Sequence, residues 1–383
     1  MNLLSLLGSL ATDEDSVPAL DRARCIHADG VDHACERCVG VCPVDAISVD
    51  MPPAIDPDAC VGCSACVPAC PVGAIAEPDP VMRLLGCAAR VDADQIELLC
   101  TRHEDVPVAP TGAAGIQIRG CLAALGVGAY IALAALGVRH VTALVDDCAA
   151  CDLGGLRTEI DVQVERASRL GVTATLSSER VTQRTGTQPL PVWQADRPPV
   201  DRRNLLRVNG GTDRESLARF LAGRDAPVEA ISRDRWRIVA GLHRLVASGL
   251  VQPDASLEGL GFASVGVGAT CNGCGMCASA CPTGALTRTI DGEWRLEHSL
   301  ADCIACEACV TVCPVEAVHL TGSPRVRDAL SAQPAVVWSG VPKRCARCGA
   351  PLGHDDAGDR CPPCEFRRQN PFGHRPPTGP SAS

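Results

Sequence analysis

The chain has 383 residues and a formal net charge of −10, and aromatic residues make up only 2% of it. The acidic balance argues against nucleic acid as a partner and favours docking onto basic faces of other proteins. Hydrophobic residues reach 46%, but most of them are small, and small side chains gain less free energy from burial. Another kind of interaction must therefore help to hold the chain together.

Cysteine supplies that interaction, because the sequence contains 25 Cys, most of them separated by gaps of two or three residues. Residues 1–10 are apolar but lack the preceding Lys or Arg of a secretory signal. We therefore expect a reducing, cytoplasmic compartment in which metal ions, and not disulfides, hold the thiolates.

Four copies of one short pattern recur along the chain. Cys42, Cys70, Cys281 and Cys313 are each followed by Pro and then by a short apolar stretch. Repetition of this kind indicates two duplicated units, which we place at residues 1–82 and 259–342.

Three of the four copies end a complete run with two, two and three residues between successive Cys. This spacing is the ligand pattern of bacterial-type ferredoxins, in which the fourth Cys of each run serves the other [4Fe–4S] cluster. Glycine inside the loops permits the backbone to approach a cluster closely. The complete runs are Cys60, Cys63, Cys66 and Cys70; Cys271, Cys274, Cys277 and Cys281; and Cys303, Cys306, Cys309 and Cys313.

The remaining run departs from the pattern, because Asp32 stands where its first Cys belongs. Cys25, ten residues before Cys35, is the natural substitute, and a longer loop with His27 would then cover the cluster. The alternative is that Cys25 is only a buried residue and that the site holds a three-iron cluster.

The crossed ligation typical of these ferredoxins assigns the cysteines to four groups of four, one for each [4Fe–4S] cluster. The first group is Cys25, Cys35, Cys38 and Cys70; the second is Cys42, Cys60, Cys63 and Cys66; the third is Cys271, Cys274, Cys277 and Cys313; and the fourth is Cys281, Cys303, Cys306 and Cys309.

Residues 83–185 alternate between strand and helix patterns, which predicts a small α/β domain with a parallel sheet. One of its helical segments, residues 121–138, has no charged residue and is long enough to suggest a membrane span. It is rich in Ala and Gly and lies between cysteines, so we expect a buried helix and no membrane span. The expected strands are 96–100, 115–118, 140–146 and 172–176, and the expected helices are 122–136 and 156–170.

This domain carries Cys100, Cys121, Cys148 and Cys151, which we call the middle group. The stretch around them resembles the small iron–sulfur delta subunit of methyl-viologen-reducing hydrogenases, which passes electrons to heterodisulfide reductase. The resemblance implies a [2Fe–2S] cluster on these four cysteines at the ends of consecutive strands. Two alternatives remain: a redox-active Cys148–Cys151 disulfide, or a degenerate domain with neither.

Residues 186–258 are expected to form a Pro-rich linker and then two helices, with Leu217, Phe220, Leu221, Ile238, Leu242 and Leu245 on their apolar face.

The C-terminal segment, residues 343–383, is interpreted as a zinc ribbon followed by a disordered tail. Cys345 and Cys348 form one Cys-x-x-Cys pair, and Cys361 and Cys364 form a second, which is the spacing of a tetrahedral zinc site. Basic residues nearby leave nucleic-acid binding as the alternative to a structural or docking role.

The two duplicated units resemble the dicluster 4Fe–4S ferredoxin and polyferredoxin families. This resemblance implies an α+β fold in which two pseudo-twofold units flank the α/β domain. No P-loop, dinucleotide-binding or radical-SAM motif is present. The sequence favours an electron carrier or oxidoreductase subunit, with four [4Fe–4S] clusters, one zinc ion and redox proteins as partners. A cluster-fed thiol–disulfide reductase and a redox-sensing or assembly factor remain as alternatives.

Overall fold

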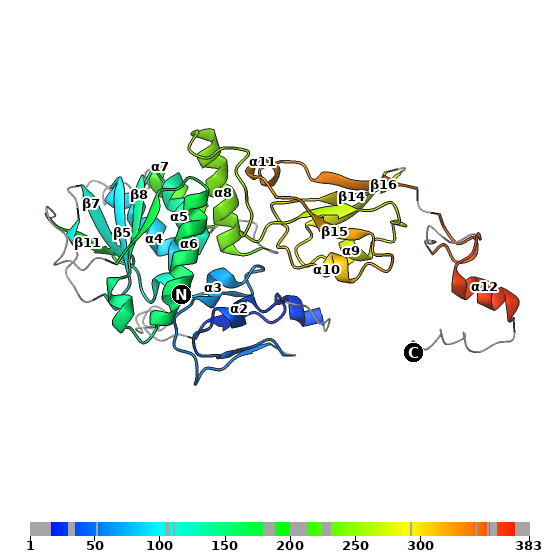
Figure 1. The fold of residues 1–383 in the computed structure, drawn as a ribbon, viewed down its shortest axis with the longest axis horizontal. Helices are drawn as coiled ribbons and strands as arrows, with labels where there is room; N and C mark the ends of the chain where they lie inside the picture. Colours follow the sequence, from blue (N-terminus) through cyan, green and yellow to red (C-terminus); the bar gives the residue numbers. More distant parts are fainter. Residues whose placement is uncertain are drawn as a thin grey trace, which may run out of the picture. The chain divides into compact units, whose positions relative to one another are not determined.

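The chain is described here from a computed structural model, in which it divides into two compact units (Figure 1). Unit 1 comprises Met1–Gly261 with Arg325–Leu330, and unit 2 comprises Phe262–Pro324 with Ser331–Ser383. The finer division into five segments stays a prediction. The structure describes residues 17–29, 35–50, 53–103, 108–109, 112–178, 188–199, 213–223, 231–291, 293–341, 343–350, 352 and 358–371. The segment expected to be a disordered tail lies largely outside these residues.

Unit 1 begins with a small lobe of short elements around the first eight clustered cysteines, which we call the N-terminal lobe. It contains two antiparallel strand pairs and short helices of about one turn each. The pairs are β1 (Ala19–Leu20) with β4 (Ile75–Glu77) and β2 (Ile47–Ser48) with β3 (Ala54–Ile55); the helices are η2 (Ile26–Asp29), α2 (Arg37–Gly40) and α3 (Cys66–Ala69).

The α/β domain of unit 1 is built on one five-stranded sheet in the order β11-β7-β5-β8-β9, and every pairing in it is parallel. This confirms the parallel sheet expected from the alternating pattern. The three central strands, β5, β7 and β8, are largely buried, as parallel strands covered on both faces are, whereas the edge strand β11 is exposed. The strands of the sheet are β5 (Gln95–Leu99), β7 (Ala113–Gln117), β8 (His140–Leu144), β9 (Ala174–Ser177) and β11 (Val192–Gln194), and the helices are α4 (Val81–Val91), α5 (Val127–Ala135) and α6 (Arg157–Arg169).

The uncharged stretch at residues 121–138 is a buried core element. It forms the short η3 (Leu122–Ala124) and then α5, all nine residues of which are buried. Its lack of charge is therefore explained by burial on every side. Across the described part of the chain, no helix combines the length and the apolar character that crossing a bilayer needs.

The segment expected to be a Pro-rich linker contributes strands to the fold. Val192–Gln194 adds an edge strand beside β7, and β10 (Gln188–Pro189) pairs with β6 (Val108–Ala109). The helix pair is present as α7 (Asp213–Ala222) and α8 (Arg233–Ala247), and α8 packs on α5. Of the expected apolar face, Phe220 instead lies 52% exposed against Trp236.

The first turn of α8 joins the N-terminal lobe to the α/β domain. Ser232 caps the helix by accepting a hydrogen bond from the Arg235 N–H at 3.2 Å. Its own N–H donates to the carbonyl of Pro71, the residue after Cys70, at 3.0 Å. Arg233 donates to the carbonyl of Ala76 in β4. The end of the second cysteine loop is therefore bonded to a helix of the α/β core.

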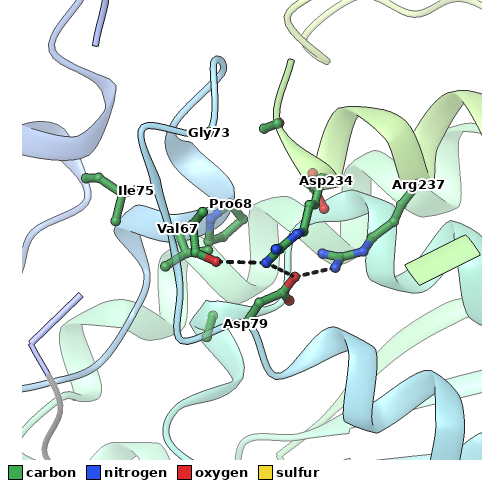
Figure 2. A pocket seen from close by; sticks show the side chains of 11 residues that line it. Val67, Pro68, Gly73, Ile75, Asp79, Asp234 and Arg237 are labelled. Carbon is green, nitrogen blue, oxygen red and sulfur yellow. Dashed lines mark hydrogen bonds and ion pairs between the residues drawn. The ribbon is translucent and has the colours of Figure 1, made fainter. Parts of the chain in front are cut away.

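A buried ion pair reinforces this junction (Figure 2). Arg237 of α8 pairs with Asp79, which lies just after β4, and both side chains are at least 96% buried. Arg233 lies 3.6 Å from the same carboxylate, and Asp79 also accepts a hydrogen bond from the N–H of Val81 at the start of α4. Because the pair is buried, removing one partner would leave a charge without compensation.

A second carboxylate, Asp234, occupies the N-terminus of α5. It accepts a hydrogen bond from the Gly128 N–H at 3.0 Å, as a carboxylate at a helix N-terminus does. A Cβ at Gly126 or Gly128 would lie 2.4–2.6 Å from the side chain or carbonyl of Asp234. The two glycines thus make room for a carboxylate of the same chain.

Unit 2 repeats the plan of the N-terminal lobe with longer strands. A strand before the first cysteine run pairs with the strand after the last Cys-Pro, and the strand after the first Cys-Pro pairs with the next one. The pairs are β12 (Ser264–Val267) with β15 (Val318–Thr321) and β13 (Leu286–Asp291) with β14 (Glu293–His298), with β16 (Ala335–Gly340) added beside β14; the helices are α9 (Met276–Ser279), α10 (Ala308–Thr311) and α12 (Pro362–Gln369).

Replacing Asp79 with Asn should destabilise unit 1 by about 3–5 kcal/mol, because Arg237 keeps its charge in a buried site without its anion. Thermal unfolding of the protein measures this effect. Asp94→Asn is the control, since Asp94 pairs with Arg139 on the surface, and it should cost less than about 1 kcal/mol. Equal effects of the two substitutions would contradict the role given to the buried pair.

Burial raises the pKa of Asp234 to about 6, and Arg237, the Gly128 N–H and Arg235 oppose that rise while Asp79 adds to it. The pKa in the folded state lies above the ordinary value of 3.8, so the folded protein binds the proton more tightly. The contribution of this group to stability is therefore greatest at low pH and is lost as pH rises from about 4 to 6, by about 3 kcal/mol at 1.36 kcal/mol per pKa unit.

The Asp234→Asn variant keeps an oxygen for the Gly128 N–H but does not titrate. The difference in unfolding free energy between wild type and this variant should therefore change with pH between 4 and 6. Chemical denaturation at several pH values measures that difference, and a flat profile would show that Asp234 titrates normally.

Candidate metal centres

The fourth cysteine of each run sits in the same local structure in all four places. Three residues after it, the backbone turns into the left-handed region, with φ of 51° at Asp45, 65° at Gly73, 66° at Gly284 and 50° at Glu316. This turn directs a following N–H back to the cysteine sulfur at 3.2–3.4 Å: Ala46 to Cys42, Ala74 to Cys70, Leu286 to Cys281 and Ala317 to Cys313. Hydrogen bonds of this kind favour the thiolate form.

The three complete loops also share a left-handed turn on each side of their central cysteine. Gly62 and Ser64 flank Cys63 in this way, Gly273 and Gly275 flank Cys274, and Ala305 and Glu307 flank Cys306. The turns bring backbone N–H groups toward sulfur, as the Gly273 N–H does to Cys271 at 3.4 Å. The close approach expected at the loop glycines therefore has a conformational basis, which two of the loops achieve without glycine at every position.

The sulfurs of the first group act on one another electrostatically. Burial, then the charges of Cys70, Cys35 and Cys25, raise the pKa of Cys38 to about 11. Burial also raises the pKa of Cys25, with Cys70 and Cys35 contributing to the rise. The structure thus brings Cys25 together with the three cysteines expected to share its site.

His27, in the described part of the segment between Cys25 and Cys35, contacts both of these cysteines. Its Nε2 lies 2.9 Å from the carbonyl oxygen of Cys35, and the ring is buried. The His27 N–H points to the sulfur of Cys25 and opposes the rise of its pKa. Asp32, at the position of the missing cysteine, lies outside the described residues.

The second group is assembled in the same way, with one cysteine from the preceding run. Burial and then Cys42 and Cys60 raise the pKa of Cys63, against the opposing N–H of Ala65. Burial, Cys63, Cys38 and Cys60 raise the pKa of Cys66 to about 12. Since Cys38 belongs to the first group, Cys66 is the point at which the two groups meet.

Unit 2 brings its cysteines together in the corresponding sets. Burial raises the pKa of Cys277 to about 11, with Cys271, Cys274 and Cys313 adding to the rise. Burial raises the pKa of Cys309 to about 12, followed by the charges of Cys281, Cys303, Cys306 and finally Cys277. Cys277 and Cys309 thus connect the third and fourth groups as Cys38 and Cys66 connect the first and second.

The middle group lies where adjacent parallel strands end. Cys100 follows β5 directly, Cys121 lies shortly after β7, and Cys148 and Cys151 follow β8, in or just after η4 (Asp146–Ala150). Burial raises the pKa of Cys121 to about 12, with Cys100 and Cys148 adding to the rise. Burial, Cys100 and Cys151 raise the pKa of Cys148 to about 11.

Backbone N–H groups point at sulfur in the middle group as they do in the ferredoxin loops. Ala123 donates to Cys121 at 3.5 Å and Leu153 donates to Cys151 at 3.4 Å. The N–H groups of Arg102 and His103 oppose the rise in the pKa of Cys100 that burial causes. In both cases the donor lies two positions after its cysteine, as it does at Cys271.

The structure also brings the second group next to the middle group, which sequence reasoning did not foresee. The charge of Cys63 contributes to the raised pKa of Cys121, after burial and the other middle cysteines. Helix α3, which begins at Cys66, packs against η3, which begins after Cys121. No local pattern links these segments, because they lie about fifty residues apart and meet only in the tertiary structure.

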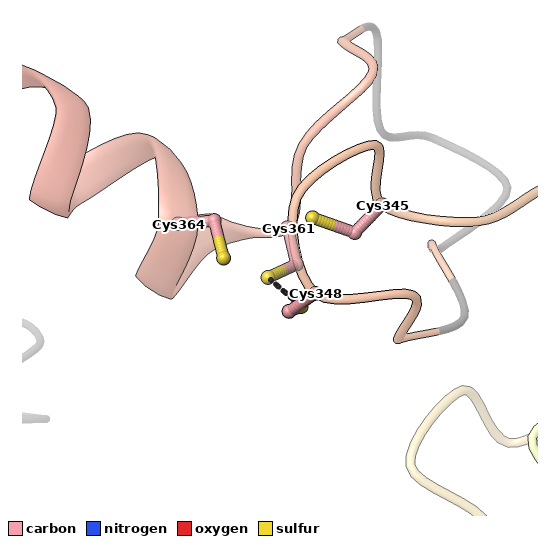
Figure 3. A group of neighbouring side chains, drawn as sticks. All are labelled: Cys345, Cys348, Cys361 and Cys364. Carbon is pink, nitrogen blue, oxygen red and sulfur yellow. Dashed lines mark hydrogen bonds between the residues drawn. The ribbon is translucent and has the colours of Figure 1, made fainter.

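The C-terminal cysteines form a tighter site (Figure 3). The sulfurs of Cys345, Cys348, Cys361 and Cys364 all lie within 4.8 Å of one another, and those of Cys348 and Cys361 are 3.6 Å apart. A zinc ion with bonds of about 2.3 Å to four tetrahedral sulfurs places them about 3.8 Å apart. The N–H groups of Cys361 and Cys348 lower the pKa of Cys345 to about 6. The site therefore fits a single tetrahedral ion.

All 25 cysteines are free thiols in this structure, Cys148 and Cys151 included. Among the described residues, the C-terminal group is the only set of cysteines whose sulfurs all approach within 4.8 Å. The wider spacing of the other groups suits a cluster of several irons with a thiolate at each iron, since such a cluster holds its ligands farther apart than one ion does. Cys87, in α4, belongs to no group. It is buried within the α/β domain, and its sulfur lies 3.8 Å from the carbonyl oxygen of Gln194.

Comparisons with known families match two of the cysteine-rich stretches. Residues 270–317 match the family model described as a 4Fe-4S dicluster domain, and residues 53–76 match the one described as a 4Fe-4S binding domain. No curated protein matches the chain. The chain therefore contains two ferredoxin-type 4Fe–4S domains, which bind [4Fe–4S] clusters and support a role in iron–sulfur electron transfer.

Removal of the metal ion that the C-terminal cysteines are expected to bind should unfold the segment 343–371 and leave the iron content unchanged, because the ion would hold the two Cys-x-x-Cys turns together. Treatment with a zinc-selective chelator, followed by metal analysis and limited proteolysis, measures this. Cys361→Ser should reproduce the effect, and Cys87→Ala is the control that should not. Retention of a protease-resistant segment after the metal is gone would contradict the site.

Proposed function

We propose that the protein relays single electrons between redox partners through four [4Fe–4S] clusters held by the first to fourth cysteine groups. The observation that carries the proposal is the fourfold arrangement of partly or fully buried cysteines whose thiolate forms would repel one another, each set with backbone N–H groups aimed at sulfur. Such a set is unfavourable as bare thiolates and becomes favourable with a cationic iron centre. Bound clusters supply reversible one-electron transfer.

The middle group is proposed to hold a further iron–sulfur centre, a [2Fe–2S] cluster. Its support is the position of the cysteines at the ends of β7, β5 and β8 and the N–H groups directed at Cys121 and Cys151. Cys63 and Cys121 set this group beside the second group. On this proposal, the N-terminal lobe and the α/β domain form one continuous redox unit.

A thiol–disulfide reductase is less well supported. A nucleophilic cysteine needs a lowered pKa, but burial, Cys100 and Cys151 raise that of Cys148 to about 11. Arg157 opposes this rise, but its effect on the pKa is smaller than that of each of those three causes. The same environment suits a metal ligand, because a bound cation would stabilise the thiolate form of Cys148.

The C-terminal site is proposed to be a structural zinc ribbon that serves docking. Trp294 of β14 has guanidinium groups on it from Arg288, at 4.7 Å, and Arg344, at 4.4 Å from the ring centroid. Arg344 directly precedes Cys345, and Arg288 donates a hydrogen bond to the Cys274 carbonyl at 2.9 Å. These contacts tie the ribbon to the sheet of unit 2 by cation–π attraction. The donor and acceptor proteins are proposed to be redox partners with basic docking faces.

Iron, sulfide and zinc analysis of protein purified without oxygen, combined with EPR, tests the proposal. We expect about sixteen iron from the four groups, about two more from the middle group, and one zinc. Cys121→Ala should remove only the two additional irons, and Cys87→Ala should remove none. Cys70→Ala should remove one ligand from the cluster of Cys25, Cys35 and Cys38. A three-iron cluster should then form in its place and be detected by its EPR signal.

Two results would contradict the proposal at different levels. Iron-free protein with its cysteines in disulfides would exclude the electron carrier. A wild-type protein with about sixteen iron, unchanged by Cys121→Ala, would leave the four-cluster carrier intact and exclude only the middle cluster.

A further inference from the structure

A buried histidine lies between two loops of the α/β domain; its backbone N–H acts on Cys100, but no role has been given to its side chain. His103 follows β5 by four residues, and its side chain is 99% buried. Its Nε2 lies 2.9 Å from Oδ1 of Asp146, a carboxylate of η4 that is 98% buried. Its Nδ1 has no hydrogen-bond partner, although the atom is fully enclosed. A buried polar atom of this kind requires a physical explanation.

The hydrogen bond to Asp146 occupies only one of the two ring nitrogens. An imidazole nitrogen donates or accepts according to the tautomer of the ring. The other nitrogen, Nδ1, lies 3.8 Å from Oδ2 of Asp147 and makes no hydrogen bond to it. A cation held between these two atoms would satisfy both.

The separation itself has the size expected for two ligands of one metal ion. A hydrogen bond between nitrogen and oxygen spans at most about 3.2 Å, which is shorter than the distance found here. Metal bonds of about 2.1 Å to nitrogen and oxygen place the two atoms between about 3.0 Å apart at a right angle and about 4.2 Å apart in line. The ligand atoms of His103, Asp146 and Asp147 all lie within 4.8 Å of one another.

We propose that His103 Nδ1 and the Asp147 carboxylate bind a divalent first-row metal ion, with Asp146 holding the imidazole in the required tautomer. A carboxylate that accepts a hydrogen bond from the far nitrogen of a ligating histidine is the usual outer support of such sites. The side chain of Asp147 is 31% exposed, so the ion has access from solvent and room for water ligands. Nitrogen and carboxylate ligands suit Mn²⁺ or Fe²⁺ better than the all-sulfur sites elsewhere in the chain do.

This mononuclear site is separate from the proposed cluster of the middle group, although both lie on the loops after β5 and β8. It uses no cysteine, and its three residues are joined to one another directly. The sequence carried no signal for it, because His103 and the two aspartates are more than forty residues apart and are not part of a spaced metal motif.

The test is a titration of the oxidised full-length holoprotein with Mn²⁺, after removal of loosely bound metal and with zinc and iron content measured. Free Mn²⁺ is counted by its EPR signal. Wild type should bind one Mn²⁺ more than the Asp147→Asn variant does. His103→Gln should likewise lose this site, and Asp146→Asn should weaken it by about 10–100-fold, as loss of an outer carboxylate does.

The matched control is Asp152→Asn, because Asp152 lies on the same loop, is 96% exposed and pairs only loosely with Arg102 at 3.7 Å. It should bind Mn²⁺ as wild type does. Iron and sulfide should be equal in all these variants, and Cys121→Ala should lose the middle cluster and still bind Mn²⁺, so the two proposals fail separately. Equal Mn²⁺ binding by wild type, Asp147→Asn and His103→Gln would overturn the metal site and leave a purely structural histidine pair.

Discussion

Thiolates gathered in a small buried volume repel one another, and the rest of this structure depends on how the chain compensates for that repulsion. Burial and neighbouring sulfurs raise the pKa of Cys66 and Cys309 to about 12. Backbone N–H groups oppose this rise in pKa at several cysteines. The left-handed turns after Cys42 and Cys313 also direct a backbone N–H toward a cysteine sulfur. Cysteines with such a raised pKa are neutral thiols at neutral pH, and a bound iron centre would supply the positive charge that favours their thiolate forms.

The dependence on metal agrees with the small size of the two ferredoxin-type regions. Their strands are short, two or three residues long in the N-terminal lobe, and a lobe of this kind buries little apolar surface. The α/β domain is different, because its five-stranded sheet and the fully buried α5 form a core of the ordinary kind. Helix α8 connects the two, through Ser232 to Pro71 on one side and through Asp234 to Gly128 on the other. The cysteine-rich lobe and the sheet domain of unit 1 are thus joined through one helix.

The elements that the sequence predicted well are those defined by local patterns. The parallel sheet followed from alternating apolar runs, and the buried character of residues 127–135 followed from their place between cysteines. The prediction was less accurate where a partner far along the chain decides the structure. Val192–Gln194 becomes an edge strand because β7 offers an unpaired edge beside it, although its Pro-rich surroundings favour a linker. The uncharged segment, expected as one helix, divides into η3 and α5, and Asp234, more than a hundred residues later, accepts a hydrogen bond from Gly128 at the start of α5.

The sequence by itself determined which cysteines belong to ferredoxin-type runs, that the runs form two pairs, and that the last four cysteines suit a single ion. Those conclusions rest on spacings of two and three residues, which short loops translate directly into ligand positions. Only the tertiary structure decided that Cys63 lies beside Cys121, that Asp79 pairs with Arg237, and that His103 faces Asp146 and Asp147. The physical reason is that each of these contacts joins segments whose distance in space is set by the packing of the sheet and of α8, which no local spacing encodes.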